Sequence, residues 1–264
     1  MNKFNQLAAP LVSAIAICIP VCATADAVRV DQSDFLPAAG LITFSEFGLN
    51  TVNPSYTSSD YGGDANSPMV TFGGFFSGQQ ISNAPATDCP GGAATGCVVG
   101  SPTGPLALDP TSPDTFVTND GSAPDSPVLS GSPQFSGPIG ILFSDPLVGV
   151  GLDGGFFDAV GSTKIEAFSL DGNSLGSVAN LNTGYNFLGL ATEDGTPQIG
   201  GLLFSLVADE PAGFGIDNLR FARAGEVVTP SNPVNDVPES SPLAFFLIGT
   251  LGAISTAFLR RRYV

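Results

Sequence analysis

Short apolar or alternating runs, separated by Gly, Asp, Asn and Pro, dominate the chain between its two ends, and no stretch there has a helical period. Such runs predict short β-strands. We expect strands at residues 41–47, 69–72, 139–143, 147–152, 186–190, 199–207 and 214–221. Residues 164–178 predict a hairpin, because the turn Asp171-Gly172-Asn173 suits positive φ angles. Many short strands with turn signals are typical of an all-β fold, and we expect a jelly-roll-like β-sandwich.

Two segments interrupt this pattern. Residues 84–135 are rich in Gly, Pro, Ser and Thr, which predicts a long irregular loop. This loop would belong to a single β-sandwich ectodomain at residues 28–223. Residues 224–236 are mostly polar and contain proline, so we expect them to form a linker.

The first 27 residues predict a secretory signal peptide with a helical apolar part. Lys3 precedes an apolar run from Leu7 to Val21, and small residues follow it. Ala25 and Ala27 each end a small-x-small triplet, so each is a candidate cleavage position. A permanent N-terminal membrane anchor is the alternative, but the apolar run is short and prolines interrupt it.

The C-terminal apolar run predicts a single transmembrane helix. Leu243 to Leu259 is a stretch of 17 residues without a charge. As a helix it would be about 26 Å long, close to the thickness of a bilayer core. Arg260, Arg261 and Arg262 follow it and would stay on the cytoplasmic side. A buried helix of the soluble domain is the alternative, but it would show a polar face.

Composition and charge narrow the classes of function. The net charge is −16, and residues 28–237 carry four basic against 22 acidic side chains. Such a surface repels phosphate, so we expect no nucleic-acid partner. The chain contains no His, which excludes His-based triads and His-ligated metal sites. It also contains no Trp, which weakens the case for a Trp platform that stacks on sugars.

Cys89 and Cys97 are the cysteines that remain after removal of the signal peptide. An even number of cysteines in an exported protein, only a few residues apart, predicts a disulfide across a small Gly-rich loop. A redox or metal-binding pair is the alternative, but two cysteines without His make a poor zinc site.

Three polar residues near the first and last expected strands are candidate ligands of Ca²⁺. Glu46 lies at the end of the first strand, and Asp217 lies in the last. The first and last strands of a jelly roll often pair, which would bring both carboxylates to one rim. Two carboxylates and a carbonyl oxygen from Asn218 would suit Ca²⁺. Two solvated acids, or an Asp217 that accepts backbone hydrogen bonds at a bulge, are the alternatives.

Residues 149–154 match the letters of the dinucleotide fingerprint G-x-G-x-x-G. That fingerprint requires a helix directly after the glycines, and the following residues have no helical pattern. We therefore expect these glycines to lie in turns.

The C-terminus resembles a PEP-CTERM sorting signal. Val237-Pro238-Glu239, an apolar span and a terminal arginine cluster form its three parts, although Ser240 stands where the family pattern has proline. The resemblance implies export in a Gram-negative bacterium, an inner-membrane intermediate, and processing by an exosortase. It also implies an extracellular polysaccharide matrix and a β-sandwich ectodomain, because "ITFSEF", "AFSLDGNSLG" and "GFGIDNLRF" are similar to motifs of that group.

These observations favour a non-enzymatic protein of the cell surface or extracellular matrix, with a structural or adhesive role in the polysaccharide envelope. A Ca²⁺-dependent carbohydrate-binding module is the alternative. A hydrolase is the third candidate, because paired acids serve glycosidases, but the sequence has no cleft signature. The expected partners are an exosortase, the membrane and extracellular polysaccharide.

Overall fold

The fold is described from a computed structural model, which defines residues 26–89, 97–121 and 123–231. Most of the expected signal peptide, the sorting motif Val237-Pro238-Glu239 and the expected membrane helix lie outside these residues. None of the helices within them has the length and apolar character needed to cross a bilayer.

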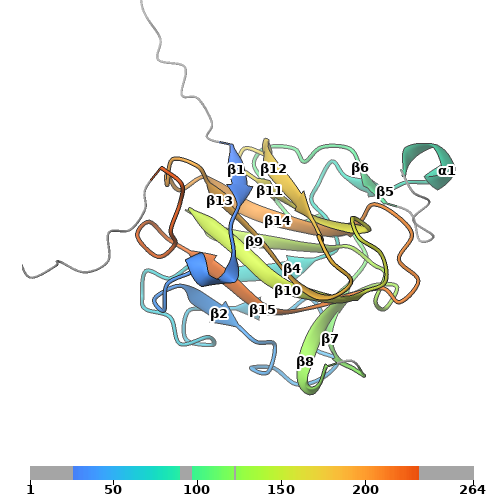
Figure 1. The fold of residues 1–264 in the computed structure, drawn as a ribbon, viewed down its shortest axis with the longest axis horizontal. Helices are drawn as coiled ribbons and strands as arrows, with labels where there is room; N and C mark the ends of the chain where they lie inside the picture. The colour runs from blue at the N-terminus through green and yellow to red at the C-terminus, as the bar shows by residue number, and fades with distance from the viewer. Residues whose placement is uncertain (1–25, 90–96, 122, 232–264) are drawn as a thin grey trace, which may run out of the picture.

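Two antiparallel sheets form a β-sandwich, which confirms the all-β prediction (Figure 1). The larger sheet has seven strands in the order β1-β13-β10-β15-β8-β7, with β2 also paired to β15. Its strands are β1 (Ala27–Arg29), β2 (Gly40–Ile42), β7 (Thr115–Asp120), β8 (Ala123–Gly131), β10 (Gly149–Phe157), β13 (Gly184–Thr192) and β15 (Gly215–Ala222).

The smaller sheet has six strands in the order β12-β11-β14-β9-β4-β3. Its strands are β3 (Ser55–Tyr56), β4 (Val70–Gly73), β9 (Ile139–Leu147), β11 (Thr163–Phe168), β12 (Ser174–Ala179) and β14 (Ile199–Leu206). A third, two-stranded ribbon projects at one edge of the sandwich together with a short helix (Figure 1). The ribbon consists of β5 (Gln80–Ile81) and β6 (Val98–Val99), and the short helix between them is α1 (Pro85–Asp88). The 3-10 helix η1 (Gln32–Asp34) lies elsewhere, between β1 and β2.

The core lies between the two large sheets and takes alternate side chains from each. Leu152, Leu188 and Leu219 of the larger sheet are fully buried, as are Ile141 and Phe204 of the smaller one. Each such side chain contributes roughly 1.5–3 kcal/mol to folding. Side chains alternate between the two faces of a strand. The residues directly before and after each buried residue of the larger sheet therefore point away from the core.

The expected hairpin is confirmed. β11 pairs with β12 in antiparallel fashion, and Gly172 in the turn between them has a φ of 82°. The expected pairing of first and last strands also occurs, since Ile42 of β2 lies opposite Leu219 of β15. β2 ends at Ile42, so the remainder of the run at residues 41–47 continues as a loop.

Three expectations are wrong. Residues 84–135 are not one irregular loop, because they contain the paired strands β7 and β8, whose Val117 and Leu129 are fully buried. The residues after 223 do not leave the domain directly, because Val227 is 2% exposed and forms a β-bridge with Phe35. The glycines of residues 149–154 lie in strand β10 rather than in turns.

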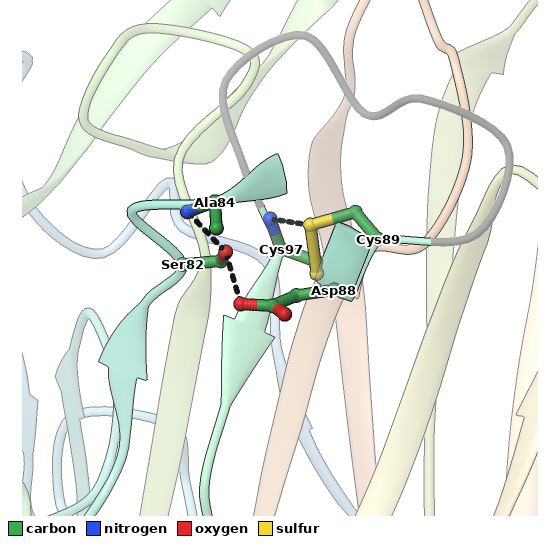
Figure 2. Close-up of a disulfide and its surroundings, with 5 residues drawn as sticks. All are labelled: Ser82, Ala84, Asp88, Cys89 and Cys97. Atoms are coloured by element: carbon green, nitrogen blue, oxygen red, sulfur yellow. Dashed lines mark hydrogen bonds between the residues drawn. A yellow bond between two sulfur atoms is a disulfide. The ribbon is translucent and has the colours of Figure 1, made fainter. Parts of the chain in front are cut away.

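The expected disulfide joins Cys89 at the end of α1 to Cys97 before β6, with 5.6 Å between their Cα atoms (Figure 2). The Ser82 hydroxyl donates to the Asp88 carboxylate at 2.7 Å and accepts from the Ala84 N–H at 3.0 Å. The Ser82 N–H donates to the Cys97 carbonyl at 2.8 Å. The crosslink and these bonds tie α1 to the ribbon, and both cysteines are buried.

Candidate functional site

A row of outward-facing side chains crosses the middle of the larger sheet. Asp153 on β10 lies directly opposite Phe187 of β13 on one side and Asp217 of β15 on the other. Leu152, directly before Asp153, is fully buried in the core, and so is Leu188, directly after Phe187. Strand alternation therefore places the two carboxylates and the Phe187 ring together on the outer face.

A β-bulge shapes the Asp217 end of this row. The register of β10 and β15 shifts between Gly151 and Asp153, and Asn218 has a φ of 49°. This geometry lets the Asn218 N–H donate to Oδ1 of Asp217 at 2.7 Å. The Asn218 side-chain amide donates to Oδ2 of Asp153 at 2.9 Å. Asn218 thus links the two carboxylates. The backbone hydrogen bond to Asp217 at a bulge agrees with one of the alternatives to a Ca²⁺ site that the sequence left open.

Both carboxylates have a raised pKa. Burial is the largest cause for Asp153, and the Asn218 amide and the Arg220 charge oppose it. Burial also raises the pKa of Asp217 most, and the charges of Asp153 and Glu46 raise it further. Hydrogen bonds from Asn218 and from the Ser126 hydroxyl, at 2.9 Å, oppose this rise. The two neighbouring carboxylates therefore destabilise the folded sheet, and the fold nevertheless keeps both on its outer face.

A small cavity of about 150 Å³ opens beside the pair. Asp153, Asp217 and Asn218 line it together with Tyr185. The Tyr185 side chain is 49% exposed, and its ring packs edge-to-face against Phe156, which is 47% exposed. The cavity thus combines carboxylate and amide groups with an exposed aromatic rim.

Glu46, the third residue of the expected Ca²⁺ site, lies near the pair but is held by its own loop. Its Oε1 accepts hydrogen bonds from the N–H and the hydroxyl of Thr43, each at 2.9 Å. It is close enough for its charge to raise the pKa of Asp217. Within the described part of the chain, its Oε2 is buried without a hydrogen-bond partner.

The groups near Asp217 do not fit a Ca²⁺ site as they stand. Over residues 26–89, 97–121 and 123–231, no three His, Cys, Asp or Glu side chains lie close enough together to hold a metal ion. Both oxygens of Asp217 already accept hydrogen bonds, and Asn218 turns its NH₂ group, not its oxygen, toward Asp153. Ca²⁺ prefers six to eight oxygen ligands. Calcium binding at Glu46, Asp217 and Asn218 is the expectation from the sequence, this arrangement argues against it, and a calcium titration decides between the two.

A second row lies next to the first on the same face. Gly151 of β10 lies opposite Gly189 of β13 and opposite Arg220 of β15, which in turn lies opposite Leu41 of β2. A Cβ atom on Gly151 would come within 2.4 Å of the Phe187 ring, and one on Gly189 within 2.7 Å. The two glycines therefore allow the Phe187 ring to lie against the sheet.

A shallow groove of about 830 Å³ runs along this second row. Phe187, Leu41 and Arg220 line it from the sheet, and Phe35 and Leu36 line it from the segment after η1. The Phe35 and Phe187 rings contact edge-to-face with centroids 5.8 Å apart. The lining of the groove is therefore mixed. Aromatic and aliphatic side chains form one part of it, Asp31, Gln32 and Ser33 add polar groups, and Arg220 contributes a guanidinium.

Sequence reasoning found Asp217 and Asn218 but missed Asp153, Tyr185 and Phe187. Asp153 directly follows the expected strand at residues 147–152, and the glycines around it were expected in turns, whereas β10 continues to Phe157. The useful signal was the alternation of Gly149 and Gly151 with Val150 and Leu152, which puts Asp153 on the same strand face as the glycines.

No family model matches the chain, and no curated protein matches its sequence. The function is therefore argued from the geometry of the outer face of the larger sheet.

Proposed function

We propose that this chain is an exported, non-enzymatic protein whose β-sandwich, of jelly-roll type, binds extracellular polysaccharide and has an adhesive role in the envelope. The observation that carries the proposal is the cluster of Asp153, Asp217 and Asn218 beside the exposed rings of Tyr185 and Phe156. The buried disulfide supports the export part, since such bonds persist in oxidising compartments.

The cluster suits a sugar because it offers both kinds of contact that a sugar ring needs. Carboxylates accept hydrogen bonds from hydroxyl groups, and the amide of Asn218 both donates and accepts. Exposed aromatic rings supply a rigid apolar surface with an amphipathic edge. Ligand sites typically combine such an apolar surface with a few fixed polar groups. A sugar can present neutral hydroxyl groups to Asp153 and Asp217, which avoids charge repulsion at these two carboxylates.

We place the cluster among binding sites rather than catalytic sites because its carboxylates are already engaged. Asp217 accepts hydrogen bonds from Ser126 and from the Asn218 N–H, and Asp153 accepts one from the Asn218 side chain. A glycosidase needs one carboxyl group on each side of the scissile bond. Two acids that are cross-strand partners on one face of a sheet are suited to contacting one side of a ligand.

The terminal segments supply the cellular context of the proposal. We propose that a helical signal at residues 1–27 directs export, and that a helix within residues 237–264 holds the protein in the inner membrane. An exosortase would then process the chain at Val237-Pro238-Glu239, and the product would reach the cell surface or matrix of a Gram-negative bacterium. Fractionation tests this part: a full-length protein that is found in the cytoplasm would contradict it.

Binding is tested with a glycan array and by affinity electrophoresis in gels containing polysaccharide. Tyr185→Ala and Asn218→Ala should each weaken binding about tenfold, through loss of a ring contact and of hydrogen bonds. Leu181→Ala is the matched control for Tyr185→Ala, because Leu181 is 60% exposed but does not line the cavity. An array without hits, or equal losses in the control, would reject the polysaccharide-binding function.

A further inference from the structure

Arg220 differs from the other cations of the described chain in its lack of a partner. Lys164 pairs with Glu166 at 2.8 Å, and Arg223 pairs with Glu226 at 2.7 Å and with Asp64 at 3.1 Å. Arg29 donates to the Ala179 carbonyl at 2.6 Å.

Within the described residues, Arg220 forms no salt bridge, and its Nε is buried without a hydrogen-bond partner. Arg220 is unpaired although residues 28–237 hold 22 acidic side chains. A buried donor without an acceptor is unfavourable, because it has lost its hydrogen bonds to water without a replacement. Asp153 feels the Arg220 charge, since Arg220 opposes the rise of its pKa, but the two do not form an ion pair. An incoming oxygen anion would offset the cost that the fold now bears at Arg220.

The groove around Arg220 has room for a sugar ring that carries such an anion, and the anion must lie nearer to Arg220 than to Asp31, which also lines the groove. Its volume of about 830 Å³ lies in the range of small-molecule sites. The Phe187 ring lies against Gly151 and Gly189, directly beside the strand position of Arg220. Phe187 can therefore contact one face of a sugar ring while Arg220 reaches a group on its edge.

We propose that this groove binds a sugar with a carboxylate substituent, a uronic acid residue of a polysaccharide, through a salt bridge to Arg220 and contact with Phe187. The guanidinium offers a planar pair of donors that matches the geometry of a carboxylate. The proposal rests on the proposed polysaccharide-binding function and names its substrate class. Asp153 lines the small cavity and lies opposite Phe187, which lines the groove. One polysaccharide chain can therefore contact the cavity and the groove together.

The test compares two forms of one polymer, polygalacturonate and its methyl ester, which differ in the carboxylate charge. The full chain in mild detergent should bind polygalacturonate about tenfold more tightly than the ester, as expected for one charged hydrogen-bonded contact. Arg220→Gln should abolish this preference, because it removes the guanidinium charge that distinguishes the two polymers. Lys164→Gln is the matched control, because it removes one positive charge from the other sheet and should keep the preference.

A second measurement covers the case in which Arg220→Gln does not fold. Arg220→Lys keeps the charge but loses the planar fork, so it should keep only part of the preference. In the unchanged protein, added salt should reduce the preference because it screens an exposed charge.

Equal binding of the two polymers by the unchanged protein, or a preference that survives in Arg220→Gln, would overturn the uronic acid proposal and leave polysaccharide binding standing. Failure to bind either polymer would also overturn it, and the glycan array then decides the broader function.

Discussion

Asp153 and Asp217 lie directly opposite each other on neighbouring strands near the middle of the larger sheet, and burial raises the pKa of both. Like charges in such positions destabilise a sheet. The fold reduces the cost with hydrogen bonds from Asn218 and Ser126 and with the nearby charge of Arg220, without an ion pair. The pair is therefore a feature that stability alone does not explain, and its effects can be measured.

Asp217→Asn should stabilise the protein at neutral pH by about 0.5–1 kcal/mol. The folded-state pKa of Asp217 is raised, so the folded chain binds the proton more tightly than the unfolded chain, and the penalty is fully present at neutral pH. It disappears as the pH falls through the folded-state pKa toward about 4. The stabilities of the two proteins should converge there in urea titrations at several pH values. A constant difference at all pH values would contradict this assignment.

Calcium should leave the melting temperature unchanged. Asp217 has both oxygens occupied by donors, and no three acidic, His or Cys side chains of the described residues gather as a metal would require. A ligand that binds only the folded state would raise the melting temperature. Thermal melts in Ca²⁺ and in EDTA check this. A rise in Ca²⁺ that is lost in both Glu46→Ala and Asp217→Ala would restore the Ca²⁺ site that the sequence suggested.

Gly151→Ala should weaken binding in the groove at a small cost in stability, below about 1 kcal/mol. The new Cβ would meet the far end of the Phe187 side chain, which can move away from the sheet, and would lie 3.1 Å from the Leu188 carbonyl oxygen, which needs only a small shift. Gly154→Ala is the contrasting variant, because its Cβ would lie 2.8 Å from the Phe157 ring inside the core. Overpacking there should cost about 1–3 kcal/mol. Equal losses of stability in denaturant titrations would show that Phe187 is as constrained as the core.

Cys89→Ser combined with Cys97→Ser should lower the free energy of unfolding by about 2 kcal/mol. The disulfide spans a sequence separation of 8, and closing so short a loop stabilises by roughly 2–3 kcal/mol in the chain-entropy model. Urea titrations with and without a reducing agent measure the loss. The double variant should be insensitive to the reducing agent, and a reduced wild-type protein that keeps its full stability would contradict the prediction.

Signal cleavage should follow Ala25 rather than Ala27. Ala27 belongs to β1 and lies opposite Thr192, and the Asp26 carbonyl accepts a hydrogen bond from the Glu193 N–H at 3.0 Å. Cleavage after Ala27 would remove both contacts from the edge of the larger sheet. Intact-mass analysis of the exported protein distinguishes the two N-termini, and a chain that begins at Val28 would show that these contacts are dispensable.

Much of the architecture followed from local patterns. The hairpin turn at Gly172 and the strands β14 and β15 could be predicted from the sequence. Each is marked by a signal within a few residues, a turn glycine or a short apolar run. The β7–β8 hairpin was not readable, because the polar and proline residues around Pro127 hide the alternation that places Leu129 in the core. Pro is compatible with such strands only at particular positions, and tertiary pairing decides which.

The sequence by itself determined the all-β class, the acidic charge and the Cys89–Cys97 disulfide, because composition, alternation and short spacing are local properties. Only the tertiary structure decided that Asp153 and Phe187 join Asp217, and that Arg220 is left without a salt-bridge partner among the described residues. These residues come from strands that are distant in the chain. Strand order and register bring them together, and cooperative packing of the two sheets, not local sequence, fixes both.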